Sequence, residues 1–170
     1  MESITIFRNN ATELISENIK GTVQNIEEYV LLCIGTGGVV SDSLGPRVGS
    51  LVKNNLKKPL IIYGDDDNNI NAQNLPLAVD FIHIMHPDKK IAVIDAAVGD
   101  STEVGCVQVI SGGITPGAAT DKTLPKLGDV SVLGVVSLRG AQNFYSSHED
   151  RVTLVQKMAQ TIADAIINVA

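Results

Sequence analysis

Two short apolar runs without any polar alternation constrain this chain more than any other feature. Tyr29–Ile34 and Ile91–Ile94 consist almost wholly of strand-forming apolar residues, and they stop abruptly at Gly35 and Asp95. A strand that is apolar on both sides must be covered on both of its faces. The two runs therefore predict buried strands of a layered sheet rather than the edge of an open one.

Segments with helical periodicity alternate with these and further strand-like runs. The expected strands are 29–34, 60–63, 91–94, 104–110 and 130–136. The expected helices are 11–20, 44–56, 72–85 and the segment after a capping box formed by Ser146 and Glu149. Alternation of apolar strands with amphipathic helices predicts an α/β layered domain with a mainly parallel sheet. At 170 residues, the chain is expected to form one domain, residues 1–170.

Charge and composition narrow the range of partners. The formal net charge of −6 disfavours nucleic acids and anionic membranes, and it favours a basic substrate over an acidic one. The sequence shows no apolar run of membrane-spanning length and no signal-like start, so a cytoplasmic location is expected. Cys33 and Cys106 lie in apolar stretches and are expected to be buried, reduced thiols. The run Asp65–Asp67 is expected to be solvated. The sequence is also compatible with a homo-oligomer.

Two acidic residues follow buried strands at the edge of the sheet where ligands usually bind. Asp42 lies in the loop after the first strand, and Asp95 directly follows Ile94. Loop amides and helix N-termini converge at the carboxyl ends of parallel strands. Two carboxyl groups sharing a cleft retain one proton near neutral pH, so one can activate water while the other donates a proton. Purely structural roles are also open for both residues. Asp42 could stabilise the start of a helix, and Asp95 could accept hydrogen bonds from loop amides.

Other chemistries have weaker support. Gly35 and Gly37 resemble the start of a dinucleotide fingerprint, but Val40 stands where its third glycine is needed. The sequence contains no phosphate-binding loop of the GxxxxGK[ST] type and no GxSxG nucleophile elbow. His83 and His86 have a spacing that permits a metal site, but a polar helix edge explains them as well. The glycine-rich stretch 112–119 could approach a peptide backbone or present amides to a developing oxyanion, but an ordinary pair of turns explains it as well.

Several motifs together resemble a known family. The first two are Cys33-Ile34-Gly35-Thr36 and Asp42-Ser43-Leu44-Gly45-Pro46. Further matches, in order, are Ile94-Asp95-Ala96, 114–118, 124–129 and 154–159. The pattern resembles the YyaC-like sporulation proteins, which are similar to the spore germination protease and more remotely to hydrogenase-maturation endopeptidases. The resemblance implies a three-layer α/β/α sandwich of the phosphorylase/hydrolase-like type with a mainly parallel, twisted sheet.

The same resemblance implies a site and a function. By analogy with the germination protease, Asp42 and Asp95 would be the catalytic pair of a peptidase of the sporulating cell or forespore, with small spore proteins as candidate substrates. The residues assigned to substrate binding are Gly35, Thr36, Ser43, Asn71, Thr115, Pro116 and Gly117. No resident cofactor is expected, although a divalent metal ion at the two acids stays open. A non-catalytic peptide- or partner-binding sporulation protein is the main alternative.

Two positions depart from the family pattern. Gly37 stands where relatives tend to carry an acid, and Asn71 stands where they tend to carry a histidine. An amide cannot act as a base or readily bind a catalytic metal. If either lost group takes part in chemistry, this member would be slow, altered in specificity or without activity.

Overall fold

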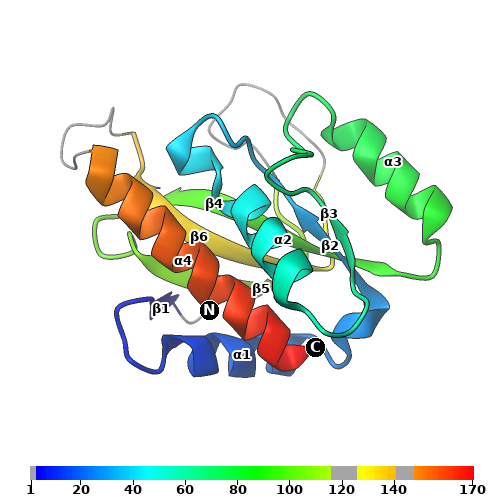
Figure 1. The fold of residues 1–170 in the computed structure, drawn as a ribbon, viewed down its shortest axis with the longest axis horizontal. Coiled ribbons are helices and arrows are strands. Elements are labelled where there is room, and N and C mark those ends of the chain that lie inside the picture. The colour runs from blue at the N-terminus through cyan, green and yellow to red at the C-terminus, as the bar shows by residue number, and fades with distance from the viewer. Residues whose placement is uncertain (1–2, 116–125, 141–147) are drawn as a thin grey trace.

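The computed structural model describes residues 3–115, 126–140 and 148–170. These residues form a sheet with helices on both faces (Figure 1). The strands are β1 (Ser3–Thr5), β2 (Tyr29–Cys33), β3 (Ile61–Tyr63), β4 (Lys90–Gly99), β5 (Cys106–Ser111) and β6 (Val130–Leu138). The helices are α1 (Ala11–Thr22), α2 (Leu44–Asn55), α3 (Leu75–Met85) and α4 (His148–Val169), with short 3-10 turns η1 (Ile26–Glu28) and η2 (Val40–Asp42).

The strand order within the described residues is β1-β5-β6-β4-β2-β3. The pairs β2–β3, β2–β4 and β4–β6 are parallel, whereas β5 runs antiparallel to β6 and β1 antiparallel to β5. The prediction of a mainly parallel sheet is thereby confirmed. Strand β1 was not predicted, because a strand of three residues is too short to show a period.

Side chains of the central strands alternate between two apolar layers. On β2, Leu31 and Cys33 belong to the cluster that contains α1, α2 and α4, whereas Val30 and Leu32 belong to the cluster that contains α3. In Figure 1, α2 and α4 cross in front of the sheet, and α3 stands apart from them. This arrangement explains why the strand is apolar on both sides, and it confirms the three-layer α/β/α sandwich. None of the described helices is long and apolar enough to cross a bilayer.

Several element boundaries differ from the predicted ones. Strand β4 does not end at Asp95 but continues to Gly99, because β6 is long enough to pair with this extension. Helix α3 starts at Leu75 rather than at residue 72, after a turn in which the amide of Leu75 donates to the carbonyl of Asn71. Helix α1 runs through Gly21, which was expected to stop it. The capping box of α4 involves Ser146, which lies outside the described residues.

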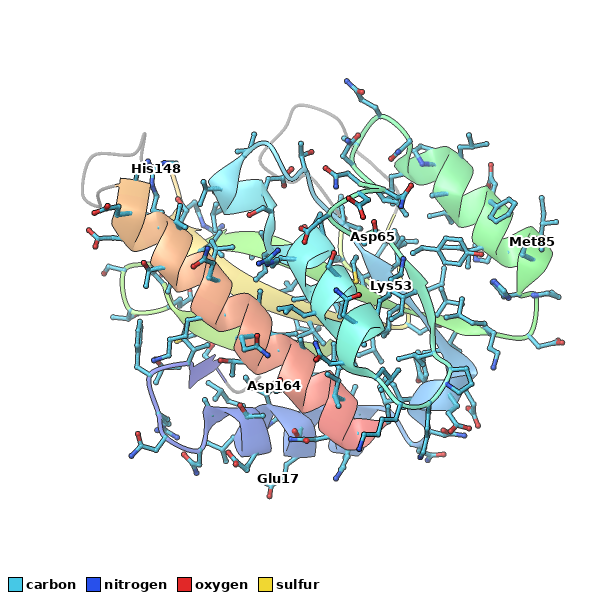
Figure 2. All side chains as sticks on the ribbon, viewed as in Figure 1. Glu17, Lys53, Asp65, Met85, His148 and Asp164 are labelled. Atoms are coloured by element: carbon cyan, nitrogen blue, oxygen red, sulfur yellow. The ribbon has the colours of Figure 1, made fainter. Side chains whose placement is uncertain are left out.

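The expectation that Asp65–Asp67 is solvated is correct for Asp66 and Asp67, which are exposed, and wrong for Asp65. Asp65 is buried, and its carboxylate pairs with the ammonium group of Lys53 on α2, as Figure 2 shows. Asp66 forms an ion pair with Arg47 at 3.0 Å. The acidic loop is therefore tied to α2, and its charges are partly neutralised by that helix. Both cysteines are buried and free, as predicted.

Helix α2 lies directly against the main chain that follows β3. A Cβ added at Gly49 would lie 2.0 Å from the carbonyl oxygen of Gly64, far closer than any real contact. Gly64 itself has φ +90°, a conformation that side chains disfavour. Only a glycine at position 49 allows this helix to approach so closely.

We expect Gly49→Ala to lower the free energy of unfolding by about 2–3 kcal/mol, because the methyl group must push α2 away from the Gly64 carbonyl. Gly21→Ala is the matched control: nothing lies within 4 Å of a Cβ added there. In α1 this change should raise the free energy of unfolding by up to about 1 kcal/mol. Urea denaturation measures both, and equal effects of the two variants would contradict the close packing.

Candidate active site

Close backbone contacts position Asp42 at the end of β2. A Cβ on Gly35, whose φ is +146°, would lie 2.0 Å from the carbonyl oxygen of Asp42. One on Gly45 would lie 2.1 Å from the carbonyl oxygen of Ile34. The amide of Thr36 donates to the Asp42 carbonyl at 2.9 Å, which closes the loop. The two glycines thus let the start of α2 fold back onto the strand and hold the backbone of Asp42 there.

Asp95 lies where β4 loses its partner β2. The last bond between these strands runs from the amide of Ile34 to the carbonyl of Ile94, at 2.8 Å. The next amide on the same edge of β4 belongs to Ala96, and it donates to Oδ1 of Asp95 at 2.8 Å. The carboxylate therefore satisfies an amide that β2 no longer reaches. On the other edge, Asp95 pairs with Leu133 of β6.

Asp42 and Asp95 lie close enough for the charge of Asp42 to act on the pKa of Asp95. Burial raises the pKa of Asp95 to about 7; the bond from the Ala96 amide acts against this rise, and the charge of Asp42 adds to it. Burial also raises the pKa of Asp42, while hydrogen bonding from the side chain and amide of Thr36 partly offsets the rise. Two neighbouring carboxyl groups with raised pKa values hold a proton near neutral pH. This is the arrangement that acid-base catalysis requires.

A pocket of about 250 Å³ opens beside Asp42, lined by Gly37, Val40, Ser43, Arg47, Asp66, Val152, Val155 and Gln156. Val40 and Ser43 flank Asp42 in the chain, but the two acids are not among the lining residues. The volume is suited to one side chain rather than to a large ligand. The sequence motifs do not point to Arg47 or to the three lining residues of α4. Arg47 could have been suspected from its place directly after the Asp42 motif, whereas the α4 positions carry no signal that separates them from core residues.

The predicted binding residues Ser43 and Asn71 make local structural bonds. The hydroxyl of Ser43 donates to the carbonyl of Val40 at 2.9 Å. Oδ1 of Asn71 accepts the amide of Gln73 at 3.0 Å in the turn before α3. Asn71 nevertheless adjoins the site, because the preceding carbonyl, that of Ile70, accepts the amide of Gly35 at 2.7 Å.

The glycine-rich stretch lies only partly within the described residues. Ile114 and Leu127 exchange backbone hydrogen bonds of 2.9 and 2.7 Å, and Thr115 follows as an exposed residue. Pro116 and Gly117 lie outside the described residues. Their predicted role in substrate binding stays a prediction.

Gly37, one of the two departures from the family pattern, is held by a neighbouring loop. Its amide donates to Oδ1 of Asn69 at 2.7 Å. A Cβ at this position would meet that same oxygen at 3.4 Å, an ordinary contact. The loop therefore has room for a side chain, and nothing in its packing requires the glycine.

The described residues offer a metal ion few ligands. No group of three His, Cys, Asp or Glu side chains suited to a metal occurs among them. His86 instead forms a hydrogen bond of 3.0 Å with the hydroxyl of Tyr63. Asp42 and Asp95 supply two carboxyl groups, and a cation between them would have to displace the proton that burial of Asp95 favours.

The described residues thus form an α/β sandwich with two acids beside one edge of its sheet. A solved structure of similar fold is the [NiFe] hydrogenase maturation protease HycI from Thermococcus kodakarensis KOD1. It has a TM-score of 0.53 and 18% sequence identity, and the alignment covers 92% of this chain and 97% of that one. At this identity the likeness shows the fold alone.

The chain belongs to the family described as "Protein of unknown function (DUF1256)", whose model matches residues 3–165. A curated relative is "Uncharacterized protein YyaC" of Bacillus subtilis (strain 168), which is 32% identical over 137 residues, 81% of this chain and 67% of the relative. The resemblance that the motifs indicate is thereby confirmed at the level of the family. Neither description states an activity.

Asp95 should make stability depend on pH. Folding raises its pKa from 3.8 to about 7, so the folded protein binds more protons than the unfolded chain between these values. The resulting stability is present in full below about pH 4 and is lost as the pH rises through 7. We expect Asp95→Asn to gain roughly 2–3 kcal/mol relative to the unchanged protein between pH 5 and pH 8, measured by urea denaturation.

Asp67→Asn, a change at an exposed site, is the control for this experiment and should show no such dependence on pH. If the free energies of unfolding of Asp95→Asn and the unchanged protein differ by the same amount at both pH values, the raised pKa is contradicted.

In Asp42→Asn, the carboxyl group of Asp95 should titrate at lower pH, because a neighbouring negative charge is removed. Carbon-13 NMR of the side chain measures that titration.

Proposed function

We propose that this protein is a sporulation-associated peptidase that hydrolyses a peptide bond with the aspartate pair Asp42 and Asp95, in the cytoplasm of the sporulating cell or forespore. The observation that carries the proposal is that burial raises the pKa values of both carboxyl groups, and that the charge of Asp42 adds to the rise at Asp95. The fold shared with a maturation protease supports the peptidase class. The link to sporulation is supported only by the motif resemblance to the germination protease.

In the proposed mechanism, the active form of the pair holds one proton on Asp95, the more deeply buried acid, whose pKa of about 7 keeps the protonated form populated near neutral pH. The carboxylate of Asp42 removes a proton from a water molecule as the water oxygen adds to the peptide carbonyl carbon. Asp95 then gives its proton to the amide nitrogen as the C–N bond breaks. One proton has moved onto Asp42 and one has left Asp95, and transfer between the two acids restores the starting state.

The pocket beside Asp42 supplies a candidate subsite for one substrate side chain. Val40, Val152 and Val155 form apolar walls, and the ion pair of Arg47 with Asp66 contributes a polar wall. An apolar side chain of moderate size matches these walls and the volume of about 250 Å³. The net charge of −6 makes nucleic acid an unsuitable ligand. Small spore proteins are the substrates proposed by analogy.

A non-catalytic peptide-binding protein is the second candidate. It is favoured by the bonds that already engage both acids, from the Ala96 amide to Asp95 and from Thr36 to Asp42. The side-chain amide of Asn71, which stands where relatives tend to carry a histidine, also favours binding without catalysis. In this reading the same cleft holds a peptide without cutting it.

The purified protein should cleave members of a panel of small spore proteins, with products identified by mass spectrometry. Asp42→Asn and Asp95→Asn should each lower kcat at least about 100-fold, because each removes one partner of the acid-base pair. Asp67→Asn, an exposed acid on the nearby loop, is the matched control and should retain activity. Circular dichroism establishes that all three variants remain folded.

Equal cleavage by the unchanged protein and both variants would overturn the catalytic assignment. Binding of the panel without cleavage, retained in both variants, would support the peptide-binding candidate. Loss of cleavage with a chelator and its return with a divalent ion would show metal-assisted hydrolysis in place of the shared-proton mechanism.

A further inference from the structure

Helix α3 carries an apolar stripe on its exposed side. Leu77, Phe81, Ile84 and Met85 are 74%, 48%, 76% and 54% exposed. Their spacing of four, three and one residues places them on one face of the helix. Figure 2 shows Met85 at the outer end of α3, at the margin of the molecule. The other exposed large apolar side chains among the described residues lie singly on other elements.

The stripe is not the side by which α3 packs on the sheet. Leu75 and Ile82 fill that role, as the two buried residues of the helix. They join the apolar layer formed by Val30, Leu32 and Val93 beneath them. Helix α3 is therefore apolar on two sides. One is buried on the sheet, and the other is exposed apart from part of Phe81, whose ring lies edge-on to that of Tyr63 with 6.1 Å between centroids.

The exposed stripe has the size of an interaction surface. Four large side chains with about half to three quarters of their area in solvent expose roughly 400–500 Å², comparable to the largest apolar patch on an ordinary monomer. Two such stripes packed together remove roughly 800–1,000 Å² from water. The exposed flanking residues Gln73, Asp80 and His83 bring the total toward the lower end of specific interfaces, about 1,200 Å².

We propose that α3 is the contact surface for a second copy of this chain, with the two α3 helices antiparallel about a two-fold axis at Phe81. Leu77 and Met85 lie one helical turn on either side of Phe81, so this axis sets Leu77 against the partner's Met85. Asp80 and His83 lie on the same flank of the stripe, and the axis sets Asp80 beside the partner's His83. The pattern is thus complementary to itself in shape, and each Asp80 carboxylate can accept a hydrogen bond from the ring N–H of the partner's His83.

The charge of α3 disfavours the other common occupant of such a stripe, a membrane surface. Helices that lie on anionic bilayers carry Lys or Arg along the polar face. The sequence of α3 contains neither residue, it contains Asp80, and the whole chain has a net charge of −6. The pocket beside Asp42 is lined by residues outside α3, so the dimer and the proposed peptidase activity can be tested separately.

Sedimentation velocity over a range of concentrations tests the proposal with the full chain. The unchanged protein should dimerise with a Kd in the micromolar range, as expected for an interface of this size. Leu77→Glu and Ile84→Glu should each raise the Kd at least about 30-fold, because each places a charge in the apolar contact. Phe7→Glu is the matched control: Phe7 is 63% exposed and lies under the ammonium of Lys157, which a glutamate can pair with, so the Kd should not change.

A charge exchange tests the antiparallel arrangement. Asp80→Lys and His83→Asp should each weaken the dimer, and the double variant should return the Kd to within about threefold of the unchanged protein. A monomer at 100 µM, or a dimer that persists in Leu77→Glu, overturns the proposal. So does flotation of the unchanged protein with vesicles of phosphatidylglycerol that Leu77→Glu abolishes. Failure of the double variant to recover overturns the two-fold axis at Phe81.

Discussion

Direct contact of main chain with main chain, where β2 meets the start of α2, is the constraint on which the candidate site depends. The positions that Cβ atoms would occupy on Gly35 and Gly45 are taken by the carbonyl oxygens of Asp42 and Ile34. Because no side chain separates these segments, Asp42 cannot move away without parting the helix from the strand. The geometry of the acid is therefore set by the backbone, which is the kind of preorganisation that electrostatic catalysis uses.

The position of the second acid, Asp95, depends on the unequal lengths of neighbouring strands. Strand β4 extends beyond β2 and is held there by β6, and Asp95 lies at the point where the pairing changes. Its burial opposes ionisation at neutral pH, so the folded state carries an electrostatic penalty at this position. Proteins tolerate such local instability mainly at functional sites. The penalty is thus consistent with a function for Asp95 beyond packing.

The fold class could be predicted from sequence because apolar runs such as Tyr29–Ile34 can exist only between two layers. The choice of Asp42 and Asp95 as candidate site residues followed from a general rule about the carboxyl ends of parallel strands. The extension of β4 could not be predicted, because it depends on the length of β6, a strand far along the chain. Likewise, the burial of Asp65 depends on Lys53 of another element. The pocket residues of α4 share the spacing of its core residues, so periodicity alone cannot separate them.

The slight anchorage of α3, through Leu75 and Ile82, has a consequence for local unfolding. An element with few buried side chains opens more readily than the whole fold, and its amides exchange hydrogen sooner. Opening of α3 would expose Val30 and Leu32 to solvent, and the apolar sheet face that they form is prone to aggregation. A ligand or subunit that binds only the closed helix would suppress this opening in proportion to its concentration. The abundance of the protein in the cell would then govern how long this sheet face stays protected.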